Sequence, residues 1–311
     1  MTAWSILSRR GLFKIRVQYI HNKAHLQLRT YSLAGSGSES GASQDPPHSC
    51  ISHDIDPGGI AEMRKAYKGT NEIFDVGDLV SKEPFKQFLS WFEEASKTDG
   101  IREANAMSLA TSTKDGIPSV RMVLMKGIDD TGIYFYTNYL SQKAKELTEN
   151  PNCSLMFYWE PLNRSLEKHF FNFRKLYLIW ICIHFSQHVR VSGAAERVSE
   201  EESSKYFHSR PKASQIGACV SLQSQVISGR KVLDDRNEAL TKKYLSDDVP
   251  IPKPDYWGGF KVIPLRFEFW QGQTNRLHDR IVFRKLQPNE EINSETTQEG
   301  SNGWVYERLM P

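Results

Sequence analysis

The sequence predicts a mainly antiparallel β fold with peripheral helices, in the α+β class. Alternating apolar and polar runs typical of strands follow one another between residues 106 and 159, with turn signals between them. Most helical patterns come before or after these runs, and the regular strand–helix–strand alternation of a parallel sheet is absent. Strands joined by turns pair antiparallel, and a sheet of this kind closes into a barrel, so a Rossmann fold is disfavoured.

The folded part of the chain is expected to span residues 60–311. Residues 1–38 contain six of the 40 basic residues and none of the 37 acidic ones. Acid-free, Arg-rich sequence of this kind is typical of a mitochondrial transit peptide, and the alternative is a disordered basic tail. Residues 39–59 are rich in Ser, Gly and Pro, as in a flexible linker. A mitochondrial or a cytoplasmic location follows from these alternatives.

Two helical patterns open the folded part, at Ala61–Tyr67 and Pro84–Ser96. In the second, large apolar residues recur on one side of the helix: Phe85, Phe88, Leu89, Trp91 and Phe92. Strands are then expected at Ala106–Ser112, Ser119–Met125, Gly132–Thr137, Ser154–Trp159, Val189–Gly193, Phe260–Trp270, Ile281–Lys285 and Trp304–Leu309. Shorter helices are expected at Gln142–Glu149, Ser199–Ser209, Ala213–Val220 and Asp234–Leu245.

Charge and cysteine content argue against several classes of protein. The whole chain has a formal net charge of +3, but without residues 1–38 the charge becomes −3, which suits nucleic acid poorly. The four cysteines show no CxxC spacing, which indicates reduced thiols and neither a disulfide framework nor a zinc site. Acidic residues with metal-ligand spacing and a Gly-rich phosphate loop are both absent. We expect no metal, no nucleic acid and no membrane as partners.

Residues 165–187 do not fit the strand pattern. Thirteen of these 23 residues are Phe, Leu, Ile, Tyr, Trp or Cys, and none is Gly or Pro. They separate two strand-like runs, Ser154–Glu160 and His188–Val191, that would otherwise form a hairpin. The apolar core of this insertion, Leu176–Phe185, is about ten residues long, whereas a membrane-spanning helix needs about 20. Three origins are open: a retained intron or faulty gene model, an unusual splice form, or a genuine extra helix.

Residues 269–280 form the most informative stretch for function. Their sequence is Phe-Trp-Gln-Gly-Gln-Thr-Asn-Arg-Leu-His-Asp-Arg, which combines an aromatic plane with two Arg side chains and a His. Arg binds phosphate in a bidentate manner and stacks on aromatic rings, so the stretch favours a flat, phosphorylated ligand. The alternative is a hairpin loop whose charges face solvent.

Two weaker signals come earlier in the chain. Arg121 lies on a predicted strand, where an Arg at the mouth of a barrel can bind a phosphate; the alternative is a solvated strand residue. Tyr136 and Thr137 end the next strand, and Gln142 and Lys143 open a helix. Hydroxyl groups, a Lys and free amides at a helix N-terminus form an anion site, although many helices begin in this way.

A stronger signal is the stretch Tyr-Phe-His-Ser-Arg-Pro-Lys-Ala-Ser-Gln that begins at Tyr206. One helix ends at Arg210, a Pro breaks it, and a second helix starts near Ser214. This junction brings Arg, Lys and Ser donors to one point, as a second phosphate site requires. The alternative is a corner between two helices in which Ser214 only caps the second. Gln223 and Ser224 follow, and offer polar groups to a ring edge.

Together these motifs resemble the pyridoxine/pyridoxamine 5'-phosphate oxidase family, over about residues 60–311 apart from the insertion. The resemblance implies a split β-barrel of the FMN-binding type and a homodimer with its active site between the subunits. It implies FMN contacts at Arg121, Met122, Val123, Leu124, Tyr136, Thr137, Gln142, Lys143, Gln187, Gln223, Ser224, Trp270 and Arg280. It implies a substrate site at Lys126, Tyr206, Arg210, Ser214, Arg276, Leu277 and His278, with Arg276 and His278 as the catalytic residues.

The implied reaction is the FMN-dependent oxidation of pyridoxine 5'-phosphate or pyridoxamine 5'-phosphate to pyridoxal 5'-phosphate, with O2 reduced to H2O2. Two alternatives stay open. One is an NAD(P)H-dependent flavin reductase built on the same barrel, which the predicted site for a small phosphorylated substrate disfavours. The other is a non-catalytic module that binds pyridoxal phosphate, or a defective isoform of the oxidase.

The chain departs from the family pattern at two places. Gln142 stands where the family usually has Arg, which removes one charge from the flavin phosphate site, so we expect weaker FMN binding. The insertion also separates Asn163 and Arg164 from the flavin-contacting Gln that follows this pair in the family. Either Gln187 or His188 must take that place.

Overall fold

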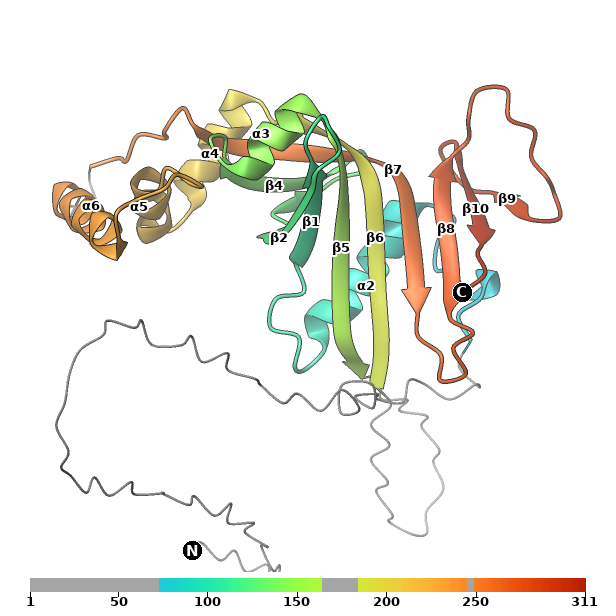
Figure 1. Cartoon of the computed structure of the whole chain (residues 1–311). Coiled ribbons are helices and arrows are strands. Elements are labelled where there is room, and N and C mark those ends of the chain that lie inside the picture. The colour runs from blue at the N-terminus through green and yellow to red at the C-terminus, as the bar shows by residue number, and fades with distance from the viewer. Residues whose placement is uncertain (1–72, 164–183, 245–248) are drawn as a thin grey trace, which may run out of the picture. The chain divides into compact units, whose positions relative to one another are not determined.

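The computed structural model describes residues 73–163, 184–244 and 249–311 (Figure 1). All of them belong to one compact unit, Ala61–Pro311. The expected helix at Ala61–Tyr67, the expected transit peptide and linker, and residues 165–183 of the insertion lie outside the described residues.

Ten strands of the described chain form one antiparallel sheet. They are β1 (Ala106–Ser112), β2 (Pro118–Leu124), β3 (Gly127–Ile128), β4 (Ile133–Asn138), β5 (Asn152–Asn163), β6 (His184–Arg197), β7 (Trp257–Gln271), β8 (Asp279–Lys285), β9 (Thr297–Glu299) and β10 (Trp304–Arg308). The order is β2-β1-β5-β6-β7-β8-β10-β9, and β4 pairs with β7 and β3. The antiparallel class expected from the sequence is confirmed.

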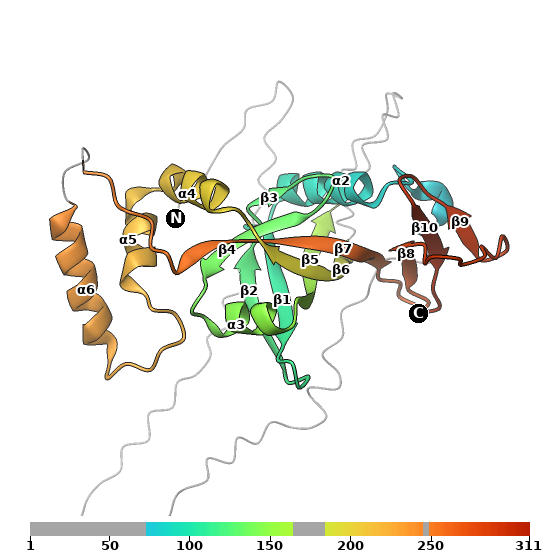
Figure 2. The same cartoon turned by 90° about the horizontal axis from the view of Figure 1, so that it is seen from above.

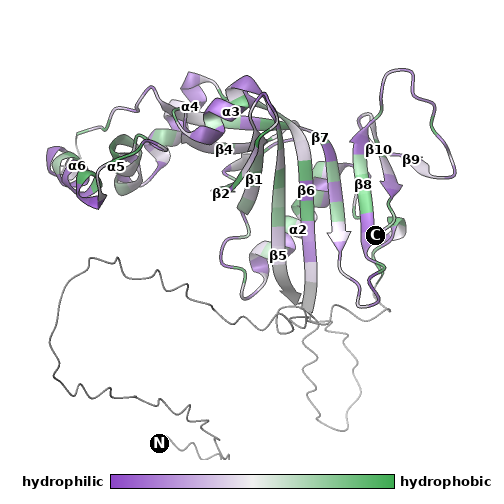
Figure 3. Cartoon of the chain, in the orientation of Figure 1, coloured by the Kyte–Doolittle hydropathy of each residue, from purple (hydrophilic) through white to green (hydrophobic). Residues whose placement is uncertain are grey.

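The long strand β7 belongs to two parts of the sheet. Its first half, Trp257–Val262, pairs with β4, and its second half, Arg266–Gln271, pairs with β8. β6 runs alongside both halves, with a register shift between Ser192 and Gly193. Figure 3 shows hydrophilic and hydrophobic residues alternating along β6 and β7, as expected for strands with one buried face. The sheet therefore branches at β7, with β4 beside its first half and β8 beside its second.

Helices flank the sheet. They are the 3-10 helix η1 (Val76–Asp78) and the α-helices α2 (Pro84–Lys97), α3 (Gln142–Glu149), α4 (Glu200–Ser209), α5 (Lys212–Val220) and α6 (Arg230–Lys243). Figure 2 shows α4 beside the start of β7, α5 and α6 beyond that end, and β8 and β10 at its other end. Among the described residues, no helix is long and apolar enough to cross a membrane.

The local sequence explains where α2 begins and ends. The Glu83 side chain accepts hydrogen bonds from the backbone N–H groups of Phe85 (3.2 Å) and Lys86 (2.9 Å), which have no partner inside the helix. Pro84 occupies the first helical position, where its missing N–H costs nothing. The helix ends at Thr98, whose N–H bonds the carbonyl of residue 95 at 3.3 Å.

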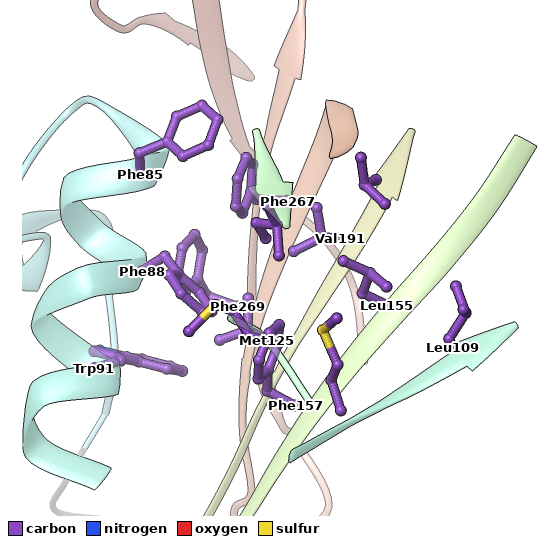
Figure 4. Close-up of a cluster of buried hydrophobic side chains, with 14 of the residues drawn as sticks. Phe85, Phe88, Trp91, Leu109, Met125, Leu155, Phe157, Val191, Phe267 and Phe269 are labelled. Carbon is purple, nitrogen blue, oxygen red and sulfur yellow. The ribbon is translucent and has the colours of Figure 1, made fainter. Parts of the chain in front are cut away.

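The apolar side of α2 covers the main core. Figure 4 shows Phe88 and Trp91 pointing from the helix toward the strands. The Phe88 ring is fully buried and lies 4.9 Å from the ring of Phe157 on β5, while the Trp91 ring lies 5.3 Å from that of Phe269 on β7. Edge-to-face aromatic pairs of this kind add to the free energy gained by burial. The expected helix at Pro84–Ser96 is thus confirmed, with its apolar side inward.

A second, smaller core lies between the late helices and the start of β7. Its buried members are Phe207, Ile216, Val220, Tyr244, Ile251 and Trp257. It ties α4 and α5 to the barrel and fixes the corner at Arg210. This small core matters for function because one of its residues, Trp257, also lines the main pocket.

Each of the eight expected strands and the expected helices within the described residues is present. The strands β3 and β9 were not expected, since two or three residues are too few to show alternation. The helix α6 begins at Arg230, four residues before the expected Asp234. Its first turn contains the ion pairs Arg230–Asp234 (2.9 Å) and Lys231–Asp235 (2.6 Å), which favour an earlier start.

Candidate active site

A pocket of about 840 Å3 lies where β2, β4 and α3 meet α4 and α5. Fourteen of the residues expected to bind FMN or substrate line it: Arg121, Met122, Val123, Leu124, Lys126, Tyr136, Thr137, Gln142, Lys143, Tyr206, Arg210, Ser214, Gln223 and Ser224. These residues come from segments far apart in the sequence. The fold therefore places side chains from several separate sequence motifs in one pocket.

Lys143 provides a buried positive charge in one wall. Its Nζ donates to Oε1 of Gln223 at 2.8 Å and to the hydroxyls of Thr137 and Ser141, both at 3.3 Å. All three acceptors are neutral. Burial, and then the nearby charge of Arg121, lowers the pKa of Lys143 to about 8. A phosphate group in the pocket would supply the anion that this amine lacks.

Arg121 lies in the same wall, held by its neighbours. Its guanidinium donates to the carbonyl of Leu109 (3.1 Å) and to the hydroxyls of Thr111 and Ser119, and lies 3.3 Å from Oε2 of Glu146. Burial opposes ionisation of Glu146, but hydrogen bonds from both hydroxyls and from Gln142 keep its carboxyl pKa below the ordinary value. Arg121 is thus fixed in orientation, and its charge is partly balanced by Glu146.

Gln142 contributes through its backbone and its side chain in different directions. Its N–H donates to Oγ of Ser224 at 3.2 Å, and its side-chain Nε2 donates to Oε1 of Glu146 at 2.9 Å. Ser224 has φ of 71°, a left-handed conformation that is uncommon outside Gly and Asn. The Gln223–Ser224 turn is therefore held against the start of α3 by hydrogen bonds from two residues of that helix.

The opposite wall contains the corner expected from the sequence. α4 ends at Ser209, Arg210 is its C-terminal cap, and α5 begins at Lys212. The Arg210 Nη1 atom is buried with no hydrogen-bond partner, and burial lowers the guanidinium pKa. Its Cζ atom lies 4.8 Å from the ring centroid of Trp257. A buried cation with a free donor is well suited to a phosphate or carboxylate ligand.

Aromatic rings line the space between these two walls. Tyr136 stacks on Tyr206 with ring centroids 3.9 Å apart and planes inclined by 24°. Both rings lie nearly parallel to that of Trp257, at 5.6 and 6.2 Å. Burial raises the pKa of both tyrosines, so their hydroxyls remain protonated donors near neutral pH. The pocket therefore combines aromatic rings with the cations Lys143 and Arg210.

The remaining expected residues lie elsewhere. Trp270 and Arg280 are cross-strand neighbours on β7 and β8, and the His278 ring lies 4.8 Å from that of Trp270. Leu277 and His278 line a second cavity of about 410 Å3 at this hairpin, and Arg276 has φ of 66°. Trp257 and Trp270 are the first and fourteenth residues of β7, so they lie about 40 Å apart along the strand. Within one chain, the residues of the β7–β8 hairpin therefore do not join those that line the pocket.

Gln187 and His188 point to opposite faces of β6. The Gln187 side chain is 3% exposed and donates from Nε2 to Oε1 of Gln271 at 3.0 Å. The His188 ring stacks on Trp270, with centroids 4.5 Å apart and planes inclined by 13°. Burial lowers the His188 pKa to about 4, so this ring is neutral at pH 7. His188, and not Gln187, therefore lies beside Trp270.

Two residues of the pocket region had no signal in the sequence. Trp257 lines the pocket although it belongs to no recognisable motif and precedes the expected strand Phe260–Trp270. Glu146 bonds Arg121 from within α3, and a lone Glu on a helix is ordinarily a solvated residue. Among the described residues, no group of three or more His, Cys, Asp or Glu is arranged to hold a metal ion.

Comparison with known proteins identifies relatives of this chain. Residues 93–244 match the family model described as pyridoxamine 5'-phosphate oxidase, and residues 257–311 match the model described as the pyridoxine 5'-phosphate oxidase C-terminal dimerisation region. Pyridoxine-5'-phosphate oxidase of Bos taurus is 48% identical over 266 residues, which cover 84% of this chain and 92% of the relative. Pyridoxine/pyridoxamine 5'-phosphate oxidase of Bombyx mori is 48% identical over 257 residues, covering 83% and 90%.

A solved structure has the same fold. The crystal structure of PhzG from Burkholderia lata 383, in complex with tetrahydrophenazine-1-carboxylic acid, is 26% identical with a TM-score of 0.59. The match covers 78% of this chain and all of that one. The split barrel expected from the sequence is thereby confirmed. On the identity and coverage of its relatives, the chain belongs to the pyridoxine/pyridoxamine 5'-phosphate oxidase family.

Proposed function

We propose that the protein oxidises pyridoxine 5'-phosphate or pyridoxamine 5'-phosphate to pyridoxal 5'-phosphate, with FMN as cofactor. One hydrogen leaves the C4' carbon as hydride and one leaves the attached hydroxyl or amine as a proton, and O2 takes up both as H2O2; for the amine substrate, water then replaces the nitrogen as ammonia. The observation that supports this most is that two cations, Lys143 with a buried amine and Arg210 with a buried Nη1, line one pocket together with aromatic rings. Two phosphorylated ring compounds suit such a pocket.

The residues around Lys143 fit the phosphate of FMN. Lys143 donates only to neutral groups in the described chain, Arg121 lies beside it, and Thr137 and Ser224 offer hydroxyls. Tyr136 offers a flat face to a ring. When bound, FMN supplies the two-electron acceptor that no side chain provides. The role of the protein is to hold this group and to align the substrate with it.

The opposite wall fits the phosphate of the substrate. Arg210 has a buried donor without a partner, and Lys126, Tyr206 and Ser214 line the same pocket. We assign the substrate phosphate to these four residues. A substrate anchored at its phosphate presents its other ring edge to the cofactor side of the pocket, where the oxidised carbon must lie.

A second copy of the chain completes the site in this proposal. Arg276 and His278 lie on the β7–β8 hairpin, remote from Arg210 of the same chain. The model that matches residues 257–311 describes a dimerisation region in its family. The outer face of β2 and β5 leaves large apolar side chains exposed, among them Met122 (63%) and Tyr158 (56%). Such a face favours a homodimer, with the hairpin of one subunit at the pocket of the other.

We assign Arg276 and His278 to the substrate ring. Nδ1 of His278 accepts a hydrogen bond from the backbone N–H of Gln273 at 3.0 Å, so the neutral ring carries its proton on Nε2. Burial lowers the His278 pKa, which keeps this form dominant at neutral pH. The proposed role of His278 is to hold a proton at Nε2 near the reacting carbon, while Arg276 binds the polar edge of the substrate.

An absorbance spectrum tests this function. We expect the purified protein to show flavin bands that bleach when pyridoxine 5'-phosphate is added without oxygen, and that return with H2O2 when air is admitted. A form without residues 165–187 serves as the comparison. Flavin in the shortened form alone would identify the full chain as a defective isoform or a mispredicted one. Flavin in neither form, with pyridoxal phosphate still bound, would replace the oxidase with a non-catalytic binding module.

A further inference from the structure

Arg210 has a charge that nothing in the described chain neutralises. Its Nη1 is buried without a hydrogen bond, and no carboxylate among the described residues pairs with it. Tyr206 and Cys219 are its ionisable neighbours, and burial raises the pKa of both, so they are neutral near pH 7. A long side chain with an unpaired charge would turn toward water unless another contact held it inside.

The ring of Trp257 supplies that contact. The Arg210 Cζ atom lies 4.8 Å from its centroid, within the range of a cation–π interaction, and 6.0 Å from the ring of Phe207. A guanidinium that lies over a ring keeps its N–H groups free in its own plane, where they can form two parallel bonds to a phosphate. The contact thus orients Arg210 without using its donors.

Trp257 is itself held firmly. Its side chain is 6% exposed, Phe207 meets its ring edge-on at 5.2 Å, and Tyr136 stacks on it at 5.6 Å. Its carbonyl accepts a hydrogen bond from Nζ of Lys253 at 2.9 Å, and its N–H donates to the carbonyl of Pro254 at 3.0 Å. Because the indole is fixed at the start of β7, it fixes the position of the Arg210 guanidinium that lies over it.

We propose that Trp257 is a positioning residue that holds Arg210 ready for the phosphate of the ligand, and thereby selects phosphorylated over unphosphorylated vitamers. This inference rests on the proposed function. A ligand with a phosphate pairs the buried guanidinium. A ligand without a phosphate leaves the guanidinium desolvated and unpaired. The same arrangement therefore favours phosphorylated ligands and disfavours unphosphorylated ones.

The first test compares Trp257→Leu with Trp257→Phe in the FMN-loaded enzyme. The Leu variant should raise the Kd for pyridoxal 5'-phosphate and for inorganic phosphate about tenfold, equivalent to about 1.4 kcal/mol. The Phe variant keeps a ring and should change each Kd by less than about threefold. For pyridoxine 5'-phosphate we expect KM to rise and kcat to hold, because the contact acts on binding. Equal losses in both variants would overturn the proposal.

A second test does not depend on how well the Leu variant folds. A multiply fluorinated tryptophan at position 257 alone keeps the shape of the indole but weakens the negative potential of its face. We expect phosphate affinity to fall as fluorine atoms are added. The same replacement at Trp304, which is 4% exposed and lies 4.4 Å from Lys285 in the main core, should leave affinity unchanged. No response at position 257 would exclude a cation–π role.

A double-mutant cycle separates action through Arg210 from a general effect on the fold. If Trp257 acts through Arg210, adding Trp257→Leu to Arg210→Lys costs little more than Arg210→Lys alone, whereas additive losses contradict the proposal. If the proposed function itself is wrong, the result is different, because the wild-type enzyme would not oxidise pyridoxine 5'-phosphate. The dependence of inorganic phosphate binding on Trp257 can be measured in either case, and decides this inference by itself.

Discussion

Lys143 is a buried lysine whose amine donates to neutral oxygens, those of Gln223, Thr137 and Ser141. Burial and the charge of Arg121 lower its pKa to about 8, against an ordinary value of 10.5. The folded protein without ligand therefore releases this proton near pH 8, while the unfolded chain keeps it to higher pH. The free energy of unfolding of the unliganded form should therefore rise as the pH increases from the folded to the unfolded pKa of Lys143. In that range the unfolded state binds more protons than the folded state.

Binding of FMN should have the opposite pH dependence. A bound phosphate restores the charge of Lys143, so binding takes up a proton above pH 8, and affinity should fall by up to about tenfold per pH unit. Fluorescence titrations at several pH values measure this. Lys143→Met should bind weakly with no such slope. Lys145→Met, an exposed lysine on the same helix, should keep it. A wild-type affinity that stays constant above pH 8 would contradict the role of Lys143.

Gln142 gives a second prediction at this scale. Its amide bonds Glu146, and Gln142 supplies one charge fewer than the Arg that the family usually has, at the site we propose for the flavin phosphate. Gln142→Arg should tighten FMN binding about tenfold, somewhat less than a charged hydrogen bond can give, because Glu146 competes for the new guanidinium. Gln142→Met serves as the control, since it adds no charge. Equal affinities for the Arg variant and the wild type would show that this position does not reach the phosphate.

At the scale of elements, β7 and β8 are joined by a buried carboxylate. The Glu268 side chain is 5% exposed and accepts hydrogen bonds from Nε (3.0 Å) and Nη2 (2.8 Å) of Arg280. Arg190 on β6 also donates to it, and Arg266 lies 3.6 Å away. Burial opposes its ionisation, but Arg280 and Arg190 keep the Glu268 pKa below the ordinary value of 4.5.

Glu268→Gln should lower the free energy of unfolding by about 2–3 kcal/mol, since it leaves several arginines without their counter-charge. The loss is smaller than for a fully buried pair because Arg190 and Arg266 are more than a third exposed. The contribution of Glu268 is present above its unfolded pKa and is lost as pH falls through the folded one. Denaturation curves should therefore differ at pH 7 and converge in acid. Glu299→Gln, at an exposed strand position, should change neither the free energy of unfolding at pH 7 nor its dependence on pH.

Much of this element structure follows from local sequence. Long strands such as β6 and β7 show alternation over enough residues to be recognised, and the break at Arg210 follows from the Pro after it. The two-residue strand β3 has no periodicity to detect, and its pairing with β4 depends on tertiary contacts. Which of Gln187 and His188 lies beside Trp270 also needed the observed register, because a shift of one residue exchanges the two faces of a strand.

At the scale of the whole molecule, sequence motifs indicated which residues to consider for the site. They did not indicate which of these residues lie close together in one chain. The two walls of the main pocket come together within one chain, as the order of strands allows. The β7–β8 hairpin does not join them, because β7 is a single extended strand with Trp257 and Trp270 at its two ends. Periodicity describes each strand separately and contains no information on the distance between motifs. Trp257 was missed for the same reason.

This separation predicts how inactive variants should behave when mixed. Arg210→Ala removes the substrate wall of a subunit, and Arg276→Ala removes its hairpin contribution. In a mixed dimer, one site receives both changes and the other receives neither. Random exchange makes half of the dimers mixed, with one intact site each, so activity should recover to about a quarter of the wild-type value.

The matched control mixes Arg210→Ala with Lys126→Ala. Both changes fall on the same side of the site, so each site of a mixed dimer keeps one defect, and activity should not return. Recovery is measured after unfolding and refolding the two variants together, with each variant refolded alone as reference. If the first mixture stays as inactive as its components, Arg276 acts within its own chain or outside the site, and the assignment of one active site to two subunits fails. If it recovers while the control does not, the hairpin of one subunit must complete the pocket of the other.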